Sequence, residues 1–91
     1  MTAKEGLWAF QNKVMVSLEI DPIKKLTTWY ERITEIGYAY DKEGEIYVFA
    51  TCKDRIANSV TTTKISEIKF AKKEDEERCH RELDIQKEQV S

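Results

Sequence analysis

The sequence is poor in the residue types that build catalytic and metal centres. It has one histidine, His80, so a His-based triad has at most one base available. Its two cysteines, Cys52 and Cys79, form no CxxC motif, whereas a structural zinc site takes about four Cys or His ligands at short paired spacings. A reducing cytosol would also keep both thiols free. We therefore predict no catalytic residue, no metal ion and no disulfide.

Glycine is scarce as well. The three glycines form no GxGxxG, P-loop or nucleophile-elbow motif, so the common sequence signatures of nucleotide binding and acyl transfer are absent. Carboxylates are numerous, but none stands in an apolar setting that would raise its pKa for acid–base chemistry. The sequence thus predicts a protein that is not an enzyme and needs no cofactor.

Long apolar runs are missing too. None approaches the roughly 20 residues that a membrane span requires, and the first residues lack the basic start and apolar core of a signal peptide. The formal net charge is −2, so no basic field gathers nucleic acid or an anionic membrane. We expect a cytoplasmic protein with no membrane and no nucleic-acid partner.

What the chain does have is a segment, 21–36, with the signals of an amphipathic helix. Asp21 suits an N-cap, and Pro22 falls at the first helical position, where its missing N–H costs nothing. Gly37 supplies a left-handed stop. Apolar residues recur at steps of three and four and predict one broad stripe: Ile23, Leu26, Trp29, Tyr30, Ile33 and Ile36. We expect this helix to pack on a sheet and hold the fold.

After residue 37 the pattern changes to alternation, which predicts a β-hairpin. Asp41 can open a type I turn and Gly44 can take the left-handed position that follows, which suits a three-residue loop with a bulge. This register pairs Asp41 with Glu45, and two facing acidic side chains count mildly against it. A two-residue loop is the alternative.

The loop decides which side chains share a face of the hairpin. The three-residue loop places Ala39, Tyr47 and Phe49 on one face, and on the other Tyr38, Tyr40, Ile46, Val48 and Ala50. A two-residue loop would instead place Tyr38 and Tyr40 on one face with Tyr47 and Phe49, because a one-residue slip turns one strand's side chains to the other face. Both faces are largely apolar in either register, so the sheet is covered on both sides or one face meets a partner.

Further strands are predicted on either side of this unit. Alternation favours one from about Lys13 to Ile20. The β-branched residues of 60–65 favour another, which extends through Phe70 with a bulge or turn near Ser66.

The apolar cluster 7–10 is too short for periodicity to decide its structure. We predict a short strand that turns into the next one. The alternative is a helical turn capped by Thr2, with Glu5 three residues on.

The chain becomes strongly charged from Ala71 onward, with seven acidic and five basic residues among the last 21. Glu74 and Arg78 stand at the favourable i,i+4 spacing of a helix. We predict an α+β fold with two parts. Residues 1–70 form a single domain, a small antiparallel sheet of about four strands on the helix 21–36. Residues 71–91 form a charged C-terminal helical extension.

These features lead to a hypothesis of protein binding, because the aromatic sheet surface exceeds what one helix covers. We expect a small regulator or inhibitor that binds a larger protein or its own copy, and a phage or mobile-element accessory protein fits this size and composition. The expected contact residues are Tyr47, Phe49, Glu74, Asp75, Glu76 and Glu77. The alternative is a nucleic-acid-binding domain that stacks bases on an aromatic sheet face.

Overall fold

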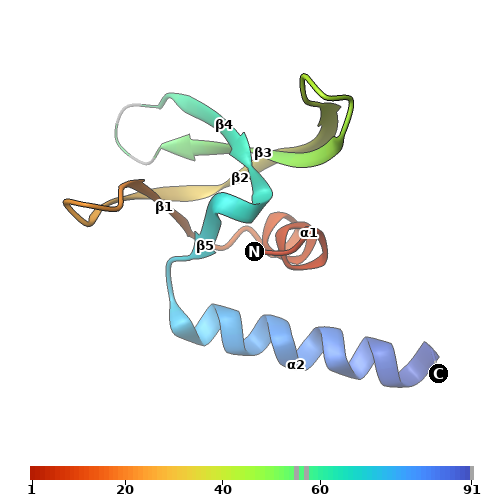
Figure 1. Cartoon of the computed structure of the whole chain (residues 1–91). Helices are drawn as coiled ribbons and strands as arrows, with labels where there is room; N and C mark the ends of the chain where they lie inside the picture. The colour runs from red at the N-terminus through yellow and green to blue at the C-terminus, as the bar shows by residue number, and fades with distance from the viewer. Residues whose placement is uncertain (55, 57, 91) are drawn as a thin grey trace.

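The computed structural model describes residues 1–54, 56 and 58–90, with side chains up to residue 84 in the last helix. Two helices flank five strands in the chain (Figure 1). The elements are α1 (Ala3–Asn12), β1 (Val16–Asp21), β2 (Leu26–Tyr40), β3 (Ile46–Asp54), β4 (Val60–Lys64), the 3₁₀ turn η1 (Ile65–Glu67), β5 (Ile68–Phe70) and α2 (Lys73–Val90). The strands form one antiparallel sheet in the order β4-β3-β2-β1-β5.

This architecture confirms the predicted α+β class, with a small antiparallel sheet and a charged C-terminal helix. The predicted helix over 21–36 is wrong. Asp21 does accept hydrogen bonds from following N–H groups, but those of Ile23 (3.0 Å) and Lys24 (3.2 Å), in a tight turn between β1 and β2. Lys25 completes the turn with φ 55°, and the rest of the segment is strand β2. An Asx-type turn and a helix N-cap use the same side-chain chemistry, so the local signal did not separate them.

The helical spacing of the apolar residues in this segment comes from two β-bulges. The β2–β3 register shifts between Tyr30 and Arg32 and again between Ile33 and Glu35. Each bulge inserts one extra residue, so apolar side chains three apart return to the same face of the strand. Tyr30 and Ile33 are accordingly buried, and Ile36 packs beside them. Outside the bulged region the predicted stripe fails, since Ile23 is 91% exposed.

The predicted three-residue hairpin loop is confirmed. Tyr40 pairs with Ile46, the Asp41 N–H donates to the Glu45 carbonyl oxygen at 2.9 Å, and Gly44 takes φ 82°. The Asp41 carboxylate accepts from the N–H groups of Glu43 (3.0 Å) and Glu45 (2.9 Å). It is therefore engaged in the turn rather than opposed to the Glu45 side chain. The two faces of the hairpin are those predicted for this register.

At the N-terminus the predicted strand over 7–10 is wrong and the helical alternative is right. The Thr2 hydroxyl accepts from the Glu5 N–H (3.2 Å), and the Glu5 carboxylate accepts from the Thr2 N–H (2.8 Å), which makes a capping box. The box starts α1, which runs through the apolar cluster and ends at Lys13 in a left-handed cap.

The remaining strands agree with the sequence except at their ends. The strand expected from about Lys13 begins at Val16. The turn expected near Ser66 is η1, which separates β4 from β5.

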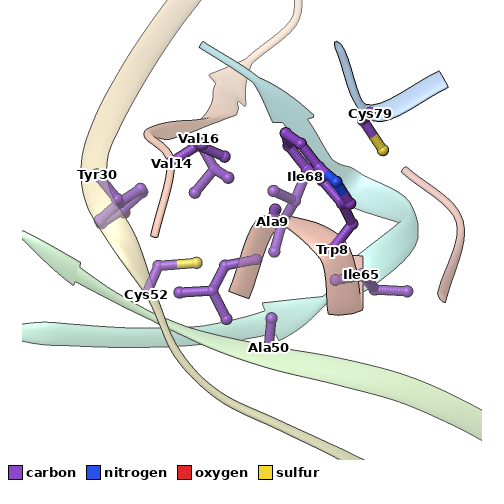
Figure 2. Close-up of a cluster of buried hydrophobic side chains, with 11 residues drawn as sticks. Trp8, Ala9, Val14, Val16, Tyr30, Ala50, Cys52, Ile65, Ile68 and Cys79 are labelled. Carbon is purple, nitrogen blue, oxygen red and sulfur yellow. The ribbon is translucent and has the colours of Figure 1, made fainter. Parts of the chain in front are cut away.

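The hydrophobic core lies between α1 and one face of the sheet. Figure 2 shows it gathered around the α1 residues Trp8 and Ala9. The sheet contributes the fully buried side chains of Val16, Ile33 and Ile68.

Helix α2 packs against α1 and β5 rather than on the sheet face. Cys79 is fully buried against the core and Leu83 is partly buried. Polar contacts to α1 surround them: the Trp8 indole N–H donates to the Glu82 carboxylate, and the Arg78 guanidinium donates to Asn12 at 2.7 Å. None of the helices in the described part of the chain is long and apolar enough to cross a membrane.

Candidate protein-binding surface

One face of the sheet is left uncovered by the described residues. Both helices lie on the side that carries the core (Figure 1), and the ladder register places Tyr47 and Phe49 on the other side. This uncovered face has an open hollow of about 430 Å³ that reaches from β2 across β3 to β4. Its lining consists of Ala39, Tyr47, Phe49, Thr62, Thr63, Lys64 and Glu67.

The floor of the hollow includes Phe49, whose ring lies over Gly37 of the neighbouring strand. The two residues are directly paired, and a Cβ atom at position 37 would come within 2.6 Å of the ring atom Cζ and 3.0 Å of Cε1. Any larger residue at 37 would therefore displace the ring from the sheet. Gly37, predicted as a helix stop, instead allows this close approach.

The wall of the hollow is built by contacts of β4 with β3 and with the turn η1. The Lys64 ammonium lies 5.1 Å from the centroid of the Tyr47 ring, a cation–π contact. The hydroxyl groups of Thr51 and Thr62 are hydrogen bonded at 2.9 Å, and the Thr63 hydroxyl donates to the Glu67 carboxylate at 2.7 Å. The hollow thus combines two aromatic rings with one positive and one negative side chain at the edge of the sheet.

The edge itself is the outer side of β4. The Asp54 N–H donates to the Ser59 carbonyl oxygen at 2.8 Å, and hydrogen-bonded pairs alternate along an antiparallel ladder. Cys52 and Thr61 therefore form the next hydrogen-bonded pair in the register, and Ala50 and Thr63 form the one after it. The backbone N–H and C=O groups of Val60 and Thr62, and the N–H of Lys64, consequently point away from β3, and no strand in the described ranges pairs with them. The Lys64 C=O caps the 3₁₀ turn η1.

The opposite edge of the sheet, β5, is different. The N–H of Ala71 donates to the carbonyl oxygen of Met15 at 3.3 Å, so the same alternation turns the backbone groups of Ile68 and Phe70 outward. The Met1 amino group donates to the Ile68 carbonyl oxygen at 2.5 Å and to that of Ile65 at 3.2 Å. One of the outward acceptors of this three-residue strand is therefore already engaged.

The structure separates the two groups of residues predicted as a contact surface. Tyr47 and Phe49 lie together on the uncovered face, as expected. Glu74, Asp75 and Glu76 lie in the first turn of α2, on the side of the sheet that carries α1, and Glu77 follows them. Acidic residues in a first helical turn complement the helix dipole, which gives them a role in the stability of α2. They do not join the aromatic surface.

The two thiols are held in their protonated form. Burial raises the pKa of Cys52 to about 11, and burial, with the nearby carboxylates of Glu5, Glu82 and Glu76, raises that of Cys79 to about 11. A thiol rather than a thiolate at neutral pH is a weak nucleophile and a weak metal ligand. In the described part of the chain, no three Cys, His, Asp or Glu side chains are grouped so that they could hold a metal ion.

Comparison of this chain with protein-family models, with curated proteins and with solved structures found no match. The surface residues that the sequence analysis missed are Thr62 and Lys64, which join the hollow only through the pairing of β3 with β4. A signal for them was present. The segment 60–64 has no proline and a single charge, unlike a strand edge that is protected against pairing.

Proposed function

We propose that this protein binds a segment of another protein as an added strand along the outer edge of β4. The observation that carries the proposal is the phase of the β3–β4 ladder, which turns the backbone groups of Val60 and Thr62 and the N–H of Lys64 outward. Extended peptides add to such edges through main-chain hydrogen bonds, and their alternate side chains occupy neighbouring pockets. The uncovered hollow beside β4 supplies such a pocket.

The chemistry of the hollow indicates the kind of segment that fits. Every second side chain of an added strand would stand over the uncovered face, beside Thr62 and Lys64. The rings of Tyr47 and Phe49 offer apolar contact, and the Lys64 ammonium offers charge pairing. These features favour a segment with an apolar side chain for the rings and an acidic side chain near Lys64.

Strand addition also suits the mode of action expected from the sequence. A bound segment is held by its backbone and cannot pair elsewhere at the same time, so one copy of this protein occupies one segment. That stoichiometry supports a regulator or inhibitor of a larger protein. A second copy of this chain is the other source of such a segment.

The test changes one backbone donor of the edge. Because the Thr62 N–H points outward, Thr62→Pro removes a donor from the free edge without removing a β3–β4 hydrogen bond, whereas Thr62→Val keeps the donor. Partners captured from the source cell's lysate by the wild-type protein should be retained by Thr62→Val and lost by Thr62→Pro. Amide exchange at 62 and 64 should slow in the complex, while exchange at 61 and 63 stays slow throughout.

Three outcomes of this test decide the proposal. Equal capture by Thr62→Pro and the wild type, without new amide protection at the edge, would show that the edge is not used. Loss of a complex on Tyr47→Ala or Phe49→Ala as well would place the hollow in the same contact. A pure wild-type protein that sizes as an oligomer, and a Thr62→Pro variant that sizes as a monomer, would identify the added strand as a second copy.

A second candidate function is single-stranded nucleic-acid binding on the uncovered face. The sequence argument against it is that basic residues do not accompany the aromatic strands, yet β4 brings Lys64 over Tyr47. The rings could stack bases, as aromatic sheet residues do in RNA-binding domains. Against this, Lys53 on the same face is 3.9 Å from the Glu31 carboxylate, and Glu35 projects from that face. Protein binding remains the better-supported function.

A further inference from the structure

The outer edge of β4 has the pattern that pairing between two identical strands requires. In a two-fold dimer the same surface of each copy contacts itself, so an edge strand must be complementary to its own reverse. The residues of β4 with outward backbone groups are evenly spaced, with Thr62 midway between Val60 and Lys64. A two-fold axis at Thr62 therefore places each of these residues opposite another one of the second copy.

The main-chain hydrogen bonds of such a pair follow from the outward groups. Thr62 lies opposite Thr62 of the second copy, and the N–H of each donates to the C=O of the other. Lys64 lies opposite Val60 of the second copy and donates its N–H to that residue's C=O. The Lys64 C=O, which caps η1, is not needed. The pairing thus satisfies the outward donors of Thr62 and Lys64 in both copies.

The side chains of two paired β4 strands also oppose one another without conflict. The Thr62 hydroxyl is hydrogen bonded to that of Thr51 at 2.9 Å, and a hydroxyl that both donates and accepts can also contact Thr62 of the second copy. Val60 is 61% exposed, and the aliphatic stem of Lys64 of the second copy can cover it. The Lys64 ammonium lies 5.1 Å from the Tyr47 ring centroid on its own β3, so like charges do not meet across the axis.

The difference between the two edges of the sheet limits this self-association to a dimer. A filament of copies joined β4 to β5 would need a second open edge on each copy, whereas β4–β4 pairing uses one edge of each copy and then closes. β5 is three residues long, and its Ile68 C=O accepts from the Met1 amino group. Helix α2 packs on α1 and β5, on the far side of the molecule from β4 (Figure 1), and leaves the approach to β4 open.

We propose that β4 pairs with β4 of a second copy, in a two-fold dimer centred on Thr62, when no partner segment is bound. The regulatory part of this inference rests on the proposed function, because the dimer occupies the edge that a partner segment would use. The paired strands are five residues long, and small interfaces are typical of transient complexes. The dimer therefore dissociates on dilution or gives way to a partner segment. Self-pairing shields an edge that has no proline and a single charge.

The first experiment measures the mass of the pure protein by analytical ultracentrifugation over a dilution series. The wild type should convert from dimer to monomer as it is diluted. Thr62→Pro removes the central donor of both copies, so two hydrogen bonds are lost and the dissociation constant should rise about tenfold or more. Thr62→Val keeps the N–H and should still form the dimer.

Cysteine substitutions then test the register of the pair. Directly opposite residues lie within the Cα–Cα range of a disulfide, whereas residues displaced by two positions do not. Thr62→Cys should therefore form a covalent dimer on mild oxidation. Thr61→Cys and Thr63→Cys should form none when each is alone, but should form a mixed disulfide when combined, because positions 61 and 63 are opposite each other. The native thiols of Cys52 and Cys79 are buried, and the oxidised wild type measures their background.

The Thr62→Cys dimer also separates this inference from the proposed function. Partners that the reduced variant captures from the source cell's lysate, freed of small thiols, should be lost when the variant is oxidised. Equal capture by both forms, or capture by neither, would contradict the proposed function and leave the dimer standing.

Other results would contradict the dimer whatever partner capture shows. A wild type that is a monomer at every concentration, or a dimer that Thr62→Pro leaves unchanged, would show that β4 does not pair with itself. Disulfides that form equally well at positions 61, 62 and 63 would exclude the register centred on Thr62. Oligomers larger than a dimer would show that the β5 edge does not close the association.

Discussion

The two edges of the sheet differ in how much of their backbone is available. β4 has three outward-facing residues, Val60, Thr62 and Lys64, and no strand in the described chain beside them. β5 is only three residues long, runs between η1 and α2, and has its Ile68 carbonyl oxygen occupied by the Met1 amino group. Short, capped edges are a common protection against unwanted pairing. Of the two edges, β4 is therefore the one at which a further strand can pair, whether that pairing is used to bind a partner or has to be prevented.

The largest expected effect comes from a substitution in β2, the central strand between the two edges. Ile33 of β2 is 1% exposed in the centre of the core, and its truncation to Ala should cost about 2–5 kcal/mol of unfolding free energy. The whole sheet, with both edges, should then melt at a much lower temperature in calorimetry.

Its matched control is Ile23→Ala in the β1–β2 turn, which should leave the melting temperature nearly unchanged because Ile23 is 91% exposed. In an amphipathic helix over 21–36 both residues would have belonged to the same buried stripe. If the two variants lost similar amounts of melting temperature, the assignment of Leu26–Tyr40 to strand β2 would be contradicted.

A second prediction separates the inner and outer sides of β4. Thr63→Pro removes an N–H that the ladder assigns to β3 and leaves a carbonyl oxygen unpaired, which should cost about 1–3 kcal/mol. Thr62→Pro should cost less, because its N–H points to solvent. Urea unfolding of both variants measures the difference. If Thr62→Pro were instead the less stable variant, the N–H of Thr62 would be the one bonded to β3 and that of Thr63 would face outward.

A third prediction concerns α2, which follows β5 in the chain. It is joined to α1 by a contact of 2.7 Å between Nε2 of His80 and the carboxylate of Glu5. The hydrogen bond with Glu5 raises the pKa of His80, and Glu76 and Asp84 add to the effect. Burial opposes ionisation of Glu5, but hydrogen bonds from Thr2 and His80 outweigh it and lower its pKa.

The sign of the pH dependence follows from these directions. The contribution of His80 is fully present below its ordinary pKa of 6.5 and is lost as pH rises through the raised value. That of Glu5 is present above its ordinary 4.5 and is lost as pH falls through the lowered value. The pair is thus strongest between pH 4.5 and 6.5.

Melting curves at several pH values test this. Relative to His80→Gln, the wild-type melting temperature should fall by about 1–3 °C between neutral and alkaline pH, a small effect because the pair is exposed. NMR titration of His80 should show a raised pKa that returns to its ordinary value in Glu5→Gln. An unshifted His80 in the wild type would refute the contact.

The smallest effect is expected for the binding of nucleic acid to the uncovered face of the sheet. Because Lys53 is paired with Glu31 and Glu35 shares the face, single-stranded oligonucleotides should show no detectable binding at physiological salt. Fluorescence anisotropy with labelled oligonucleotides measures this. A micromolar affinity that falls steeply with salt and is lost in Tyr47→Ala would favour the second candidate function.

The sequence predicted those parts of the fold that depend on neighbouring residues. Asp41 and Gly44 specify the hairpin loop locally, and the loop fixes the register that places Tyr47 with Phe49. The capping box of Thr2 and Glu5 is likewise encoded by neighbouring residues, although the apolar cluster 7–10 that follows it predicts a strand. The acidic first turn of α2 also follows from local spacing.

The helix over 21–36 shows where such reasoning fails. Steps of three between Tyr30, Ile33 and Ile36 fit a helix and a doubly bulged strand equally well, and only pairing with β3 distinguishes them. The same limit applies to the binding edge. Which backbone groups of 60–64 face outward depends on the phase of a ladder between segments that are distant from each other, so no local pattern encodes it.

The two bulges in β2 also affect how this strand can change length during evolution. Glu31 and Thr34 are the extra residues of the bulges, each without a direct partner in the β2–β3 register. Deleting either one would restore plain alternation at that point while every other residue kept its partner and its face. A relative that lacks one of them would therefore align with a one-residue gap inside a core strand and would read as an ordinary strand there. In such an alignment, a gap at position 31 or 34 would be a sign of shared structure.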